Sequence, residues 1–261
     1  MKRSEFLAQG ESWLYLPQEG EGPFPVVLYC HGWGGCRDIP DTLRPLRKAL
    51  LAAGCAFASF TFEGSGKNGA DLLPYITYTR LTEQLNGVIE ALRAQPQIDA
   101  ARIGCLAVSS GTVPALRLAA TPGKAPAFVV AVAACVSPQI DMPHGGVAKI
   151  VSEHLHELAA GGRALLFGVP YGEAFLRDVL ENAPMHTMHR VSCPVLFLQG
   201  GRDNPYRRAD ALLGTFLLQE AGKPVEHKEL AQGGHVLDGA EEACAEETLA
   251  WLRRICILPE E

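Results

Sequence analysis

Short apolar runs of strand length alternate with amphipathic segments of helix length along almost the whole chain. The apolar run Phe24–Cys30, for example, is followed by a glycine-rich turn and a helical pattern over Thr42–Ala53. Because parallel strands are joined by crossover helices, this alternation predicts an α/β fold with a mostly parallel central sheet and helices on both faces. The predicted strands are Ser4–Gln9, Glu11–Leu16, Phe24–Cys30, Cys55–Phe62, Ile103–Val108, Phe128–Val136, Pro194–Gln199 and Val225–Leu230, and the predicted helices of the sheet layers are Thr42–Ala53, Tyr78–Ala94, Val113–Ala120, Arg207–Ala221 and Glu241–Ile255.

The segment 137–190 interrupts this alternation. It separates two consecutive predicted strands by far more chain than a crossover helix needs. Helical patterns over Val147–Ala159 and Glu173–Glu181 fall within it. We therefore expect a core domain built from residues 1–136 and 191–261, with the segment inserted as a small cap over the carboxyl edge of the sheet. An ordinary long connection with a structural role is the alternative.

The run Ile103–Val108 leads into a serine that is flanked by small residues. Ala107 and Gly111 stand two positions before and two positions after Ser109. Small residues there allow a sharp strand-to-helix turn, which lifts the serine hydroxyl out of the sheet and points the next backbone N–H at developing negative charge. The motif predicts a nucleophilic serine at Ser109, although a strand that runs into a serine N-cap fits the same residues.

Ser110 is the alternative nucleophile. Its neighbours at the same two positions are Val108 and Thr112. Both are β-branched and would crowd so sharp a turn. The pattern therefore favours Ser109 over Ser110.

A serine hydroxyl is a poor nucleophile at neutral pH and needs a base, which a third group must orient. In an open parallel sheet, these groups lie on loops at the carboxyl ends of the strands. Asp203 follows one predicted strand closely, and His235 lies just beyond the next. We predict a triad of Ser109, Asp203 and His235, in the chain order expected for this architecture. Asp141, which follows an earlier strand, is the alternative acid.

Glycines also follow the strand Phe24–Cys30, in the turn His31-Gly32-Trp33-Gly34-Gly35. Such a turn allows a backbone N–H to point at the oxygen of a reacting carbonyl. We assign one oxyanion donor to the backbone N–H of Trp33 and the second to that of Ser110. Two such donors contribute about 3–4 kcal/mol each to stabilising a transition state. His31 is expected to support the turn rather than to act as a base.

Together these motifs resemble those of the α/β-hydrolase superfamily. The resemblance covers nearly the whole chain, in the expected order. The compact insert and the Phe-Glu-Gly-Ser-Gly turn at 62–66 are similar to those of the cinnamoyl/feruloyl esterases and their serine-aminopeptidase-like relatives. Ala107 departs from the motif, which most often has glycine there. The motifs that carry the resemblance are the His-Gly-Trp-Gly turn at 31–34, the serine turn at 107–111, Gly200-Gly201-Arg202-Asp203 and Gly234-His235.

This resemblance implies a serine esterase that cleaves small aryl or short-chain acyl esters through an acyl-enzyme, without a metal or an organic cofactor. Its partner would be a small-molecule ester. The same triad also serves peptidases and thioesterases, and a binding protein without turnover could keep the fold. In the insert, Phe167, Tyr171 and Phe175 are candidates to line an apolar substrate pocket, although such side chains also pack a cap onto its core.

The charge of the chain argues against two classes of partner. It carries 23 Lys and Arg against 29 Asp and Glu, a formal net charge of −6, and no long basic cluster. Nucleic acid and anionic membrane surfaces are therefore not expected as partners. No apolar run follows the basic residues near the N-terminus, so no signal peptide is expected. No stretch reaches the roughly 18 apolar residues of a membrane span.

The eight cysteines include no Cys-x-x-Cys pair, which argues against zinc-knuckle and dithiol sites. Several lie in apolar strand-like runs, where a thiol is a small core residue, so reduced thiols and a cytoplasmic location are expected. His186 and His189 could share a helix face, but no third ligand completes a metal site. The run Gly64–Gly69 fits G-x-G-x-x-G but lacks the acidic partner of a dinucleotide site. A homodimer is left open.

Overall fold

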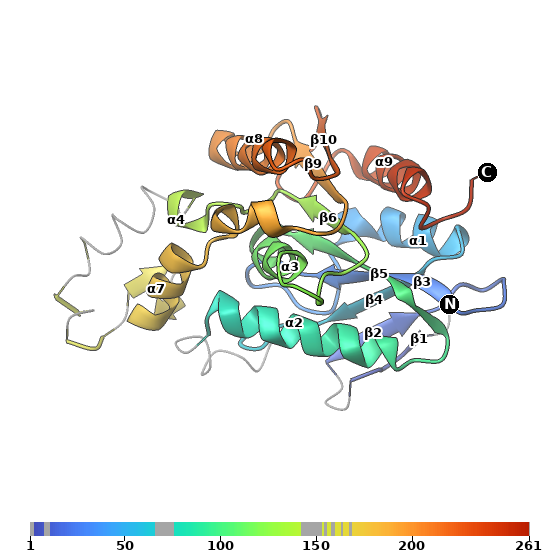
Figure 1. Ribbon diagram of the computed structural model, residues 1–261, viewed down its shortest axis with the longest axis horizontal. Helices are drawn as coiled ribbons and strands as arrows, with labels where there is room; N and C mark the ends of the chain where they lie inside the picture. Colours follow the sequence, from blue (N-terminus) through green and yellow to red (C-terminus); the bar gives the residue numbers. More distant parts are fainter. Residues whose placement is uncertain are drawn as a thin grey trace.

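The computed structural model describes residues 3–7, 11–65, 76–141, 153, 156–157, 160–162, 164–166 and 169–260. Within these residues, one sheet has the strand order β1-β2-β4-β3-β5-β6-β9-β10 (Figure 1). β1 and β2 run antiparallel to their neighbours, and the other six strands run parallel, which confirms the predicted α/β fold. The strands are β1 (Arg3–Ser4), β2 (Ser12–Tyr15), β3 (Phe24–Cys30), β4 (Ala56–Phe60), β5 (Ile98–Val108), β6 (Val129–Val132), β9 (Val195–Gly200) and β10 (Val225–Leu230).

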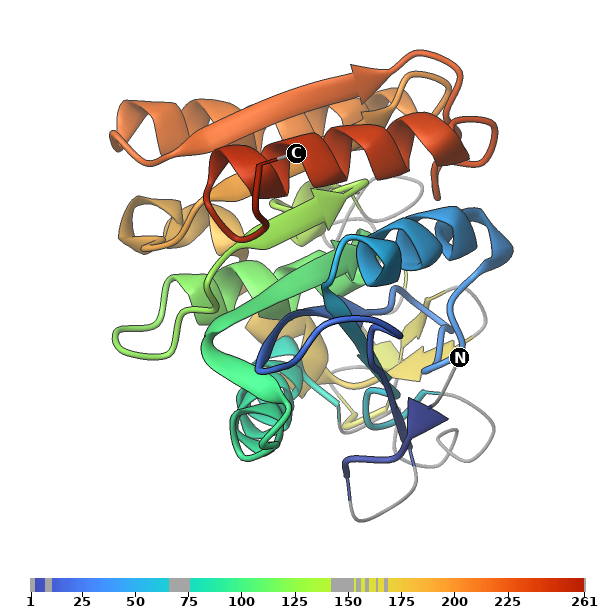
Figure 2. The same cartoon turned by 90° about the vertical axis from the view of Figure 1, so that its right-hand side faces the viewer.

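Helices cover both faces of this sheet. The helices α2, α3 and α8 pack on one face, and α1 and α9 lie side by side on the other (Figure 2). Side chains of a strand alternate between the faces, so Val26 and Leu28 of β3 belong to the first core, and Val27 and Tyr29 to the second. The helix bounds are α1 (Arg44–Ala52), α2 (Tyr78–Arg93), α3 (Thr112–Ala119), α8 (Pro205–Glu220) and α9 (Glu241–Arg254).

Strand β6 is shorter than the sequence predicts. It ends at Val132, four residues before the predicted end at Val136, because Ala133 has a left-handed backbone with φ 47° that leaves the strand conformation. Ala133, Ala134 and Val136 are nevertheless fully buried. Their apolar side chains therefore continue the sequence pattern of a strand after the strand itself has ended, and the chain turns toward the rim of the sheet here.

The predicted insert lies between β6 and β9, which are neighbours in the sheet. Its described elements are α4 (Pro138–Asp141), the antiparallel pair β7 (Ala164–Leu166) and β8 (Val169–Tyr171), α7 (Glu173–Glu181), which has its predicted bounds, and two short 3-10 helices at Pro184–His186 and Met188–Arg190. The helix predicted over Val147–Ala159 falls mostly outside the described residues. Figure 1 shows α7 beside the start of α2, at one end of the sheet.

A buried carboxylate attaches α7 to the two helices beneath it. Asp178 of α7 accepts hydrogen bonds from the Thr79 backbone N–H of α2 at 3.0 Å and from the Thr79 hydroxyl. It also pairs with the Arg117 guanidinium of α3 at 3.3 Å and accepts from the Asn182 amide at 3.0 Å. Side-chain exposure is only 7% for Asp178 and 15% for Arg117. This network fixes the position of α7 on the core.

The last strand of the sheet, β10, is lined with ion pairs. Glu226 pairs with Arg254 of α9 at 2.7 Å, and Lys228 lies 3.6 Å from Glu247 of the same helix. On the other side, Glu229 pairs with Arg208 of α8 at 3.0 Å. Charged side chains therefore connect this edge strand to the helices on both faces. Among the described helices, none has the length and apolar character needed to cross a membrane.

Candidate active site

Ser109 stands on a sharp turn at the carboxyl end of β5. Its backbone has φ 52°, a left-handed conformation that is strained for a residue with a side chain. A Cβ on Gly111 would lie 2.4 Å from the carbonyl oxygen of His31 and 2.5 Å from that of Cys30, so only glycine lets the start of α3 pass the end of β3. Ala107 is fully buried before the turn. The small residues predicted on both sides thus serve close backbone packing.

Thr112, in the first turn of α3, connects this turn to the next strand. Its hydroxyl donates to the carbonyl oxygen of Ser109 at 2.5 Å and accepts from the backbone N–H of Cys135 at 2.8 Å. Thr112 is fully buried. The end of β6 and the Ser109 turn are therefore held at a fixed distance from each other.

His235 bridges Ser109 and Asp203. Its Nε2 lies 3.1 Å from the Ser109 hydroxyl oxygen, and its Nδ1 lies 3.1 and 3.0 Å from the two carboxylate oxygens of Asp203. In the tautomer that fits these contacts, Nδ1–H donates to the carboxylate and the Nε2 lone pair accepts from the serine hydroxyl. The structure thus brings together the three predicted residues, and the hydroxyl that contacts the imidazole is that of Ser109.

Asp203 is held as a carboxylate. Its side chain is 4% exposed, and this burial alone would raise its pKa. Hydrogen bonds from His235 and from the Gln199 amide, at 2.9 Å, outweigh burial, so the pKa of Asp203 lies below its usual value. Its other hydrogen bond comes from the backbone N–H of Asn204 at 2.7 Å. Asp141, the alternative acid, ends α4, and its side chain lies outside the described part of the chain.

Close packing of Gly200-Gly201 against Gly233-Gly234 places Asp203 beside His235. The backbone N–H of Gly201 donates to the carbonyl oxygen of Leu230 at 2.8 Å, and that of Arg202 donates to the carbonyl oxygen of Gly233 at 2.9 Å. A Cβ on Gly200 would lie 2.1 Å from the carbonyl oxygen of Gly234. The loops after β9 and β10 therefore touch through bare backbone, which brings acid and base together.

His31 has a structural place behind the glycine turn. Its Nε2 accepts a hydrogen bond from the backbone N–H of Phe62 at 2.8 Å, and its Nδ1 donates to the carbonyl oxygen of Gly32 at 2.7 Å. Burial lowers the pKa of His31 to about 4, so the ring is neutral at neutral pH. Trp33 and Ser110, the predicted oxyanion donors, both line the pocket that holds Ser109. Their donor role stays a prediction.

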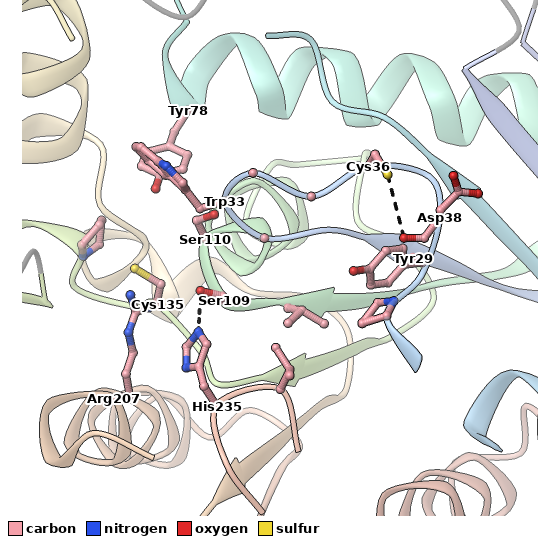
Figure 3. A pocket seen from close by; sticks show the side chains of 17 residues that line it. Tyr29, Trp33, Cys36, Asp38, Tyr78, Ser109, Ser110, Cys135, Arg207 and His235 are labelled. Atoms are coloured by element: carbon pink, nitrogen blue, oxygen red, sulfur yellow. Dashed lines mark hydrogen bonds between the residues drawn. The ribbon is translucent and has the colours of Figure 1, made fainter. Parts of the chain in front are cut away.

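The Ser109 hydroxyl opens into a pocket of about 660 Å³ (Figure 3). Several of its wall residues carry no sequence motif: Tyr29, Cys36, Asp38, Tyr78, Cys135 and Arg207. Sequence position could have identified some of them. Cys36, Asp38 and Cys135 follow β3 and β6, at the carboxyl edge of the parallel strands where site residues lie. In the described part of the chain, no group of three or more His, Cys, Asp or Glu could hold a metal ion.

The three aromatic residues predicted to line the pocket have different outcomes. Phe175 is buried behind the wall: its ring centroid lies 6.2 Å from that of Trp33 and 5.5 Å from that of Tyr78, and both of these residues do line the pocket. Phe175 thus supports the wall from α7. Phe167 falls outside the described residues, as does the side chain of Tyr171.

No family model and no curated protein matches the sequence. Solved structures do match it. Est1E from Butyrivibrio proteoclasticus has a TM-score of 0.71 at 12% identity, over 98% of this chain and 99% of its own. Its structure with ferulic acid bound has a TM-score of 0.74 at 14% identity, over 93% and 94%.

Two further solved structures also match the chain. The esterase domain of a Rhodothermus marinus protein matches with a TM-score of 0.64 at 19% identity, over 97% of each chain. An acylaminoacyl peptidase from Pyrococcus horikoshii matches with a TM-score of 0.71 at 16% identity, over 96% of this chain and 40% of its own. At these identities the likeness concerns the fold: the chain has the α/β-hydrolase fold.

Proposed function

We propose that this chain, which has the α/β-hydrolase fold, is a serine hydrolase that cleaves carboxylic esters. The observation that carries the proposal is the contact series from Ser109 through His235 to Asp203, with all three nitrogen–oxygen distances between 3.0 and 3.1 Å. A hydroxyl, an imidazole and a buried carboxylate in this order form a nucleophile, its base and the group that orients the base.

In the proposed reaction, His235 takes the Ser109 proton on Nε2 while the serine oxygen attacks the ester carbonyl carbon. The carboxylate of Asp203 stabilises the imidazolium that forms. The tetrahedral oxyanion accepts hydrogen bonds from the backbone N–H groups of Trp33 and Ser110. His235 then gives its proton to the departing alcohol, which leaves an acyl group on Ser109. Water, activated by the same imidazole, releases the acid and restores the serine.

The proposed substrates are esters with a small aryl or short acyl group. The pocket volume of about 660 Å³ suits a small molecule, since such sites usually measure about 300–1,000 Å³. Aromatic side chains at the pocket, Trp33 and Tyr78, offer ring faces for stacking. The structural neighbour Est1E has been solved with ferulic acid, an aryl acid, bound.

We also propose that residues 137–190 form a cap on a core of residues 1–136 and 191–261. The support is the position of α7, which is fixed by Asp178 and carries Phe175 against two residues of the pocket wall. Reduced thiols and a cytoplasmic location stay part of the proposal, because six of the eight cysteines are buried, where a thiol serves as a small core residue.

The test is hydrolysis of p-nitrophenyl esters of graded acyl length, together with methyl ferulate. Ser109→Ala should remove essentially all turnover and leave the fold intact, because the attacking oxygen is lost. Ser110→Ala is the matched control: its backbone N–H is kept, so turnover should persist. Activity in Ser109→Ala comparable to that of the unchanged chain would contradict the triad. Turnover of aminoacyl amides but of no ester would assign the site to a peptidase instead.

A further inference from the structure

One polar side chain in the buried part of β9 contacts the acid of the proposed triad. The strand passes through four buried apolar residues, 195–198, and then reaches Gln199, which is fully buried as well. An amide in such surroundings costs free energy unless its polar atoms are hydrogen-bonded. Gln199 is not among the described residues that line the Ser109 pocket. Its side chain therefore acts inside the protein and not on the substrate.

The amide of Gln199 turns its nitrogen toward two acceptors. Nε2 donates to the carboxylate of Asp203 at 2.9 Å and to the carbonyl oxygen of Gly200 at 3.3 Å. Because an ionised carboxylate and a carbonyl only accept, the amide oxygen cannot take the place of the nitrogen. This oxygen, Oε1, is buried and has no hydrogen-bond partner among the described residues. Gln199 thus leaves one of its own polar atoms unsatisfied, at a cost in stability, while it donates to Asp203.

Each oxygen of the Asp203 carboxylate receives a donor of its own. The backbone N–H of Asn204 donates to Oδ1 at 2.7 Å, and the amide of Gln199 donates to Oδ2 at 2.9 Å. His235 does not select between the two oxygens, since its Nδ1 lies 3.1 and 3.0 Å from them. The orientation of the carboxylate is therefore set by the two neutral donors. Neither of these amides titrates, so both donate at any pH at which the protein is folded.

The ionisation of Asp203 depends on the same contacts. Burial raises the pKa of Asp203, and the hydrogen bonds from His235, Gln199 and Asn204, together with the charge of His235, lower it below its usual value. Within the described chain, His235 is the one titratable group in this set. The charged side chains on α8, on β10 and on the loops after β9 and β10 are not among the causes; they are Arg202, Arg207, Arg208, Asp210, Glu229 and Asp238.

We infer that Gln199 is a positioning residue, whose amide holds the carboxylate of Asp203 in place against His235. The inference rests on the proposed function. A fixed, ionised carboxylate keeps Nδ1–H of His235 toward Asp203 and the Nε2 lone pair toward Ser109. Without the amide, burial would favour a protonated acid, which cannot stabilise the imidazolium that forms when His235 takes the serine proton.

The first variant, Gln199→Met, keeps a long side chain of similar volume and removes the amide. It should lower kcat for p-nitrophenyl butyrate about 10- to 100-fold, the range for a lost hydrogen bond to a charged group. KM should stay nearly unchanged, because Gln199 lies outside the pocket wall. The matched control is Gln219→Met, on the exposed side of α8, which should alter neither constant. Circular dichroism shows whether each variant is folded.

The second variant, Gln199→Glu, is almost isosteric and replaces the amide by a group that titrates. Two carboxyl groups in contact do not both ionise readily, so the pair should retain one proton, and the protonated member can donate to the other as the amide does. Once that proton is lost, two carboxylates face each other. In a profile from about pH 5 to about pH 9, kcat/KM should therefore fall toward the basic side, where the unchanged chain stays active. Gln219→Glu, with the same change of charge on the surface, should keep the profile of the unchanged chain.

The outcomes separate this role from the proposed function. A folded Gln199→Met with unchanged kcat would overturn the positioning role. So would a Gln199→Glu variant whose activity is equal to that of the unchanged chain, or lower by the same factor at every pH, because a merely structural residue does not depend on that proton. Gln199→Glu decides the question if Gln199→Met fails to fold. An unchanged chain that hydrolyses no ester would instead overturn the proposed function, and the positioning role with it.

Discussion

Replacing Asp178 by alanine should destabilise the protein strongly, because it leaves a buried cation without its partner. The carboxylate of Asp178 accepts from the Thr79 backbone and hydroxyl, from Asn182 and from Arg117, whose side chain is only 15% exposed. Removing one member of a buried ion pair costs about 3–5 kcal/mol, since the remaining charge stays desolvated. With a urea dependence of about 3 kcal/mol per molar, the urea concentration at the unfolding midpoint should fall by about 1–1.7 M.

The assay is urea unfolding followed by circular dichroism, with a control on the same helix. Glu181 of α7 pairs with Arg177 at 3.7 Å, and both side chains are well exposed. Glu181→Ala should therefore change the free energy of unfolding by no more than about 0.5 kcal/mol. The double variant Arg117→Leu with Asp178→Leu, which removes both charges, should be more stable than Asp178→Ala. A shift in Asp178→Ala as small as that in Glu181→Ala would refute the reasoning.

Two other predictions concern His31 and the acid of the triad. Because burial lowers the pKa of His31 to about 4, the unfolded chain binds a proton near the ordinary value of 6.5 and the folded chain does not. Through His31, the free energy of unfolding should thus fall by about 2 kcal/mol between about pH 7 and about pH 5. In His31→Gln, urea unfolding at the two pH values should show a fall that is smaller by this amount. Asp203→Asn should lower kcat for ester hydrolysis by about 10⁴-fold, because the imidazole then adopts the wrong tautomer. Asp141→Asn is the control and should leave kcat unchanged. A larger loss of kcat in Asp141→Asn than in Asp203→Asn would make Asp141 the acid of the triad.

The sequence predicts best where residue chemistry sets local geometry. The bounds of β3, β10 and α7 agree with the prediction to the residue, because turn residues or changes of periodicity mark both ends of each. The predicted end of β6 was wrong, because the left-handed backbone at Ala133 lies within an apolar run, and no residue type in that run indicates it.

The same limit applies to the site. Ser109, Asp203 and His235 each follow a strand, so the topology of a parallel sheet already brings them to one edge. The wall residues depend on packing between distant elements. Arg207 reaches the pocket only because Asp210 docks α8 on the end of β6. The sequence made Phe175 a candidate pocket residue. Its hydrophobicity predicts that it is buried, but not that Trp33 and Tyr78 lie between it and the pocket.

The ion pairs along β10 have a consequence for how copies of this chain can meet. An open sheet edge is a template on which another strand can pair, and natural proteins often block it with charge. A second chain that extended the sheet at β10 would have to approach Glu226, Lys228 and Glu229 and disturb their pairs with α8 and α9. These charges thus protect this edge against aggregation, so a dimer of this protein would not extend the sheet at β10.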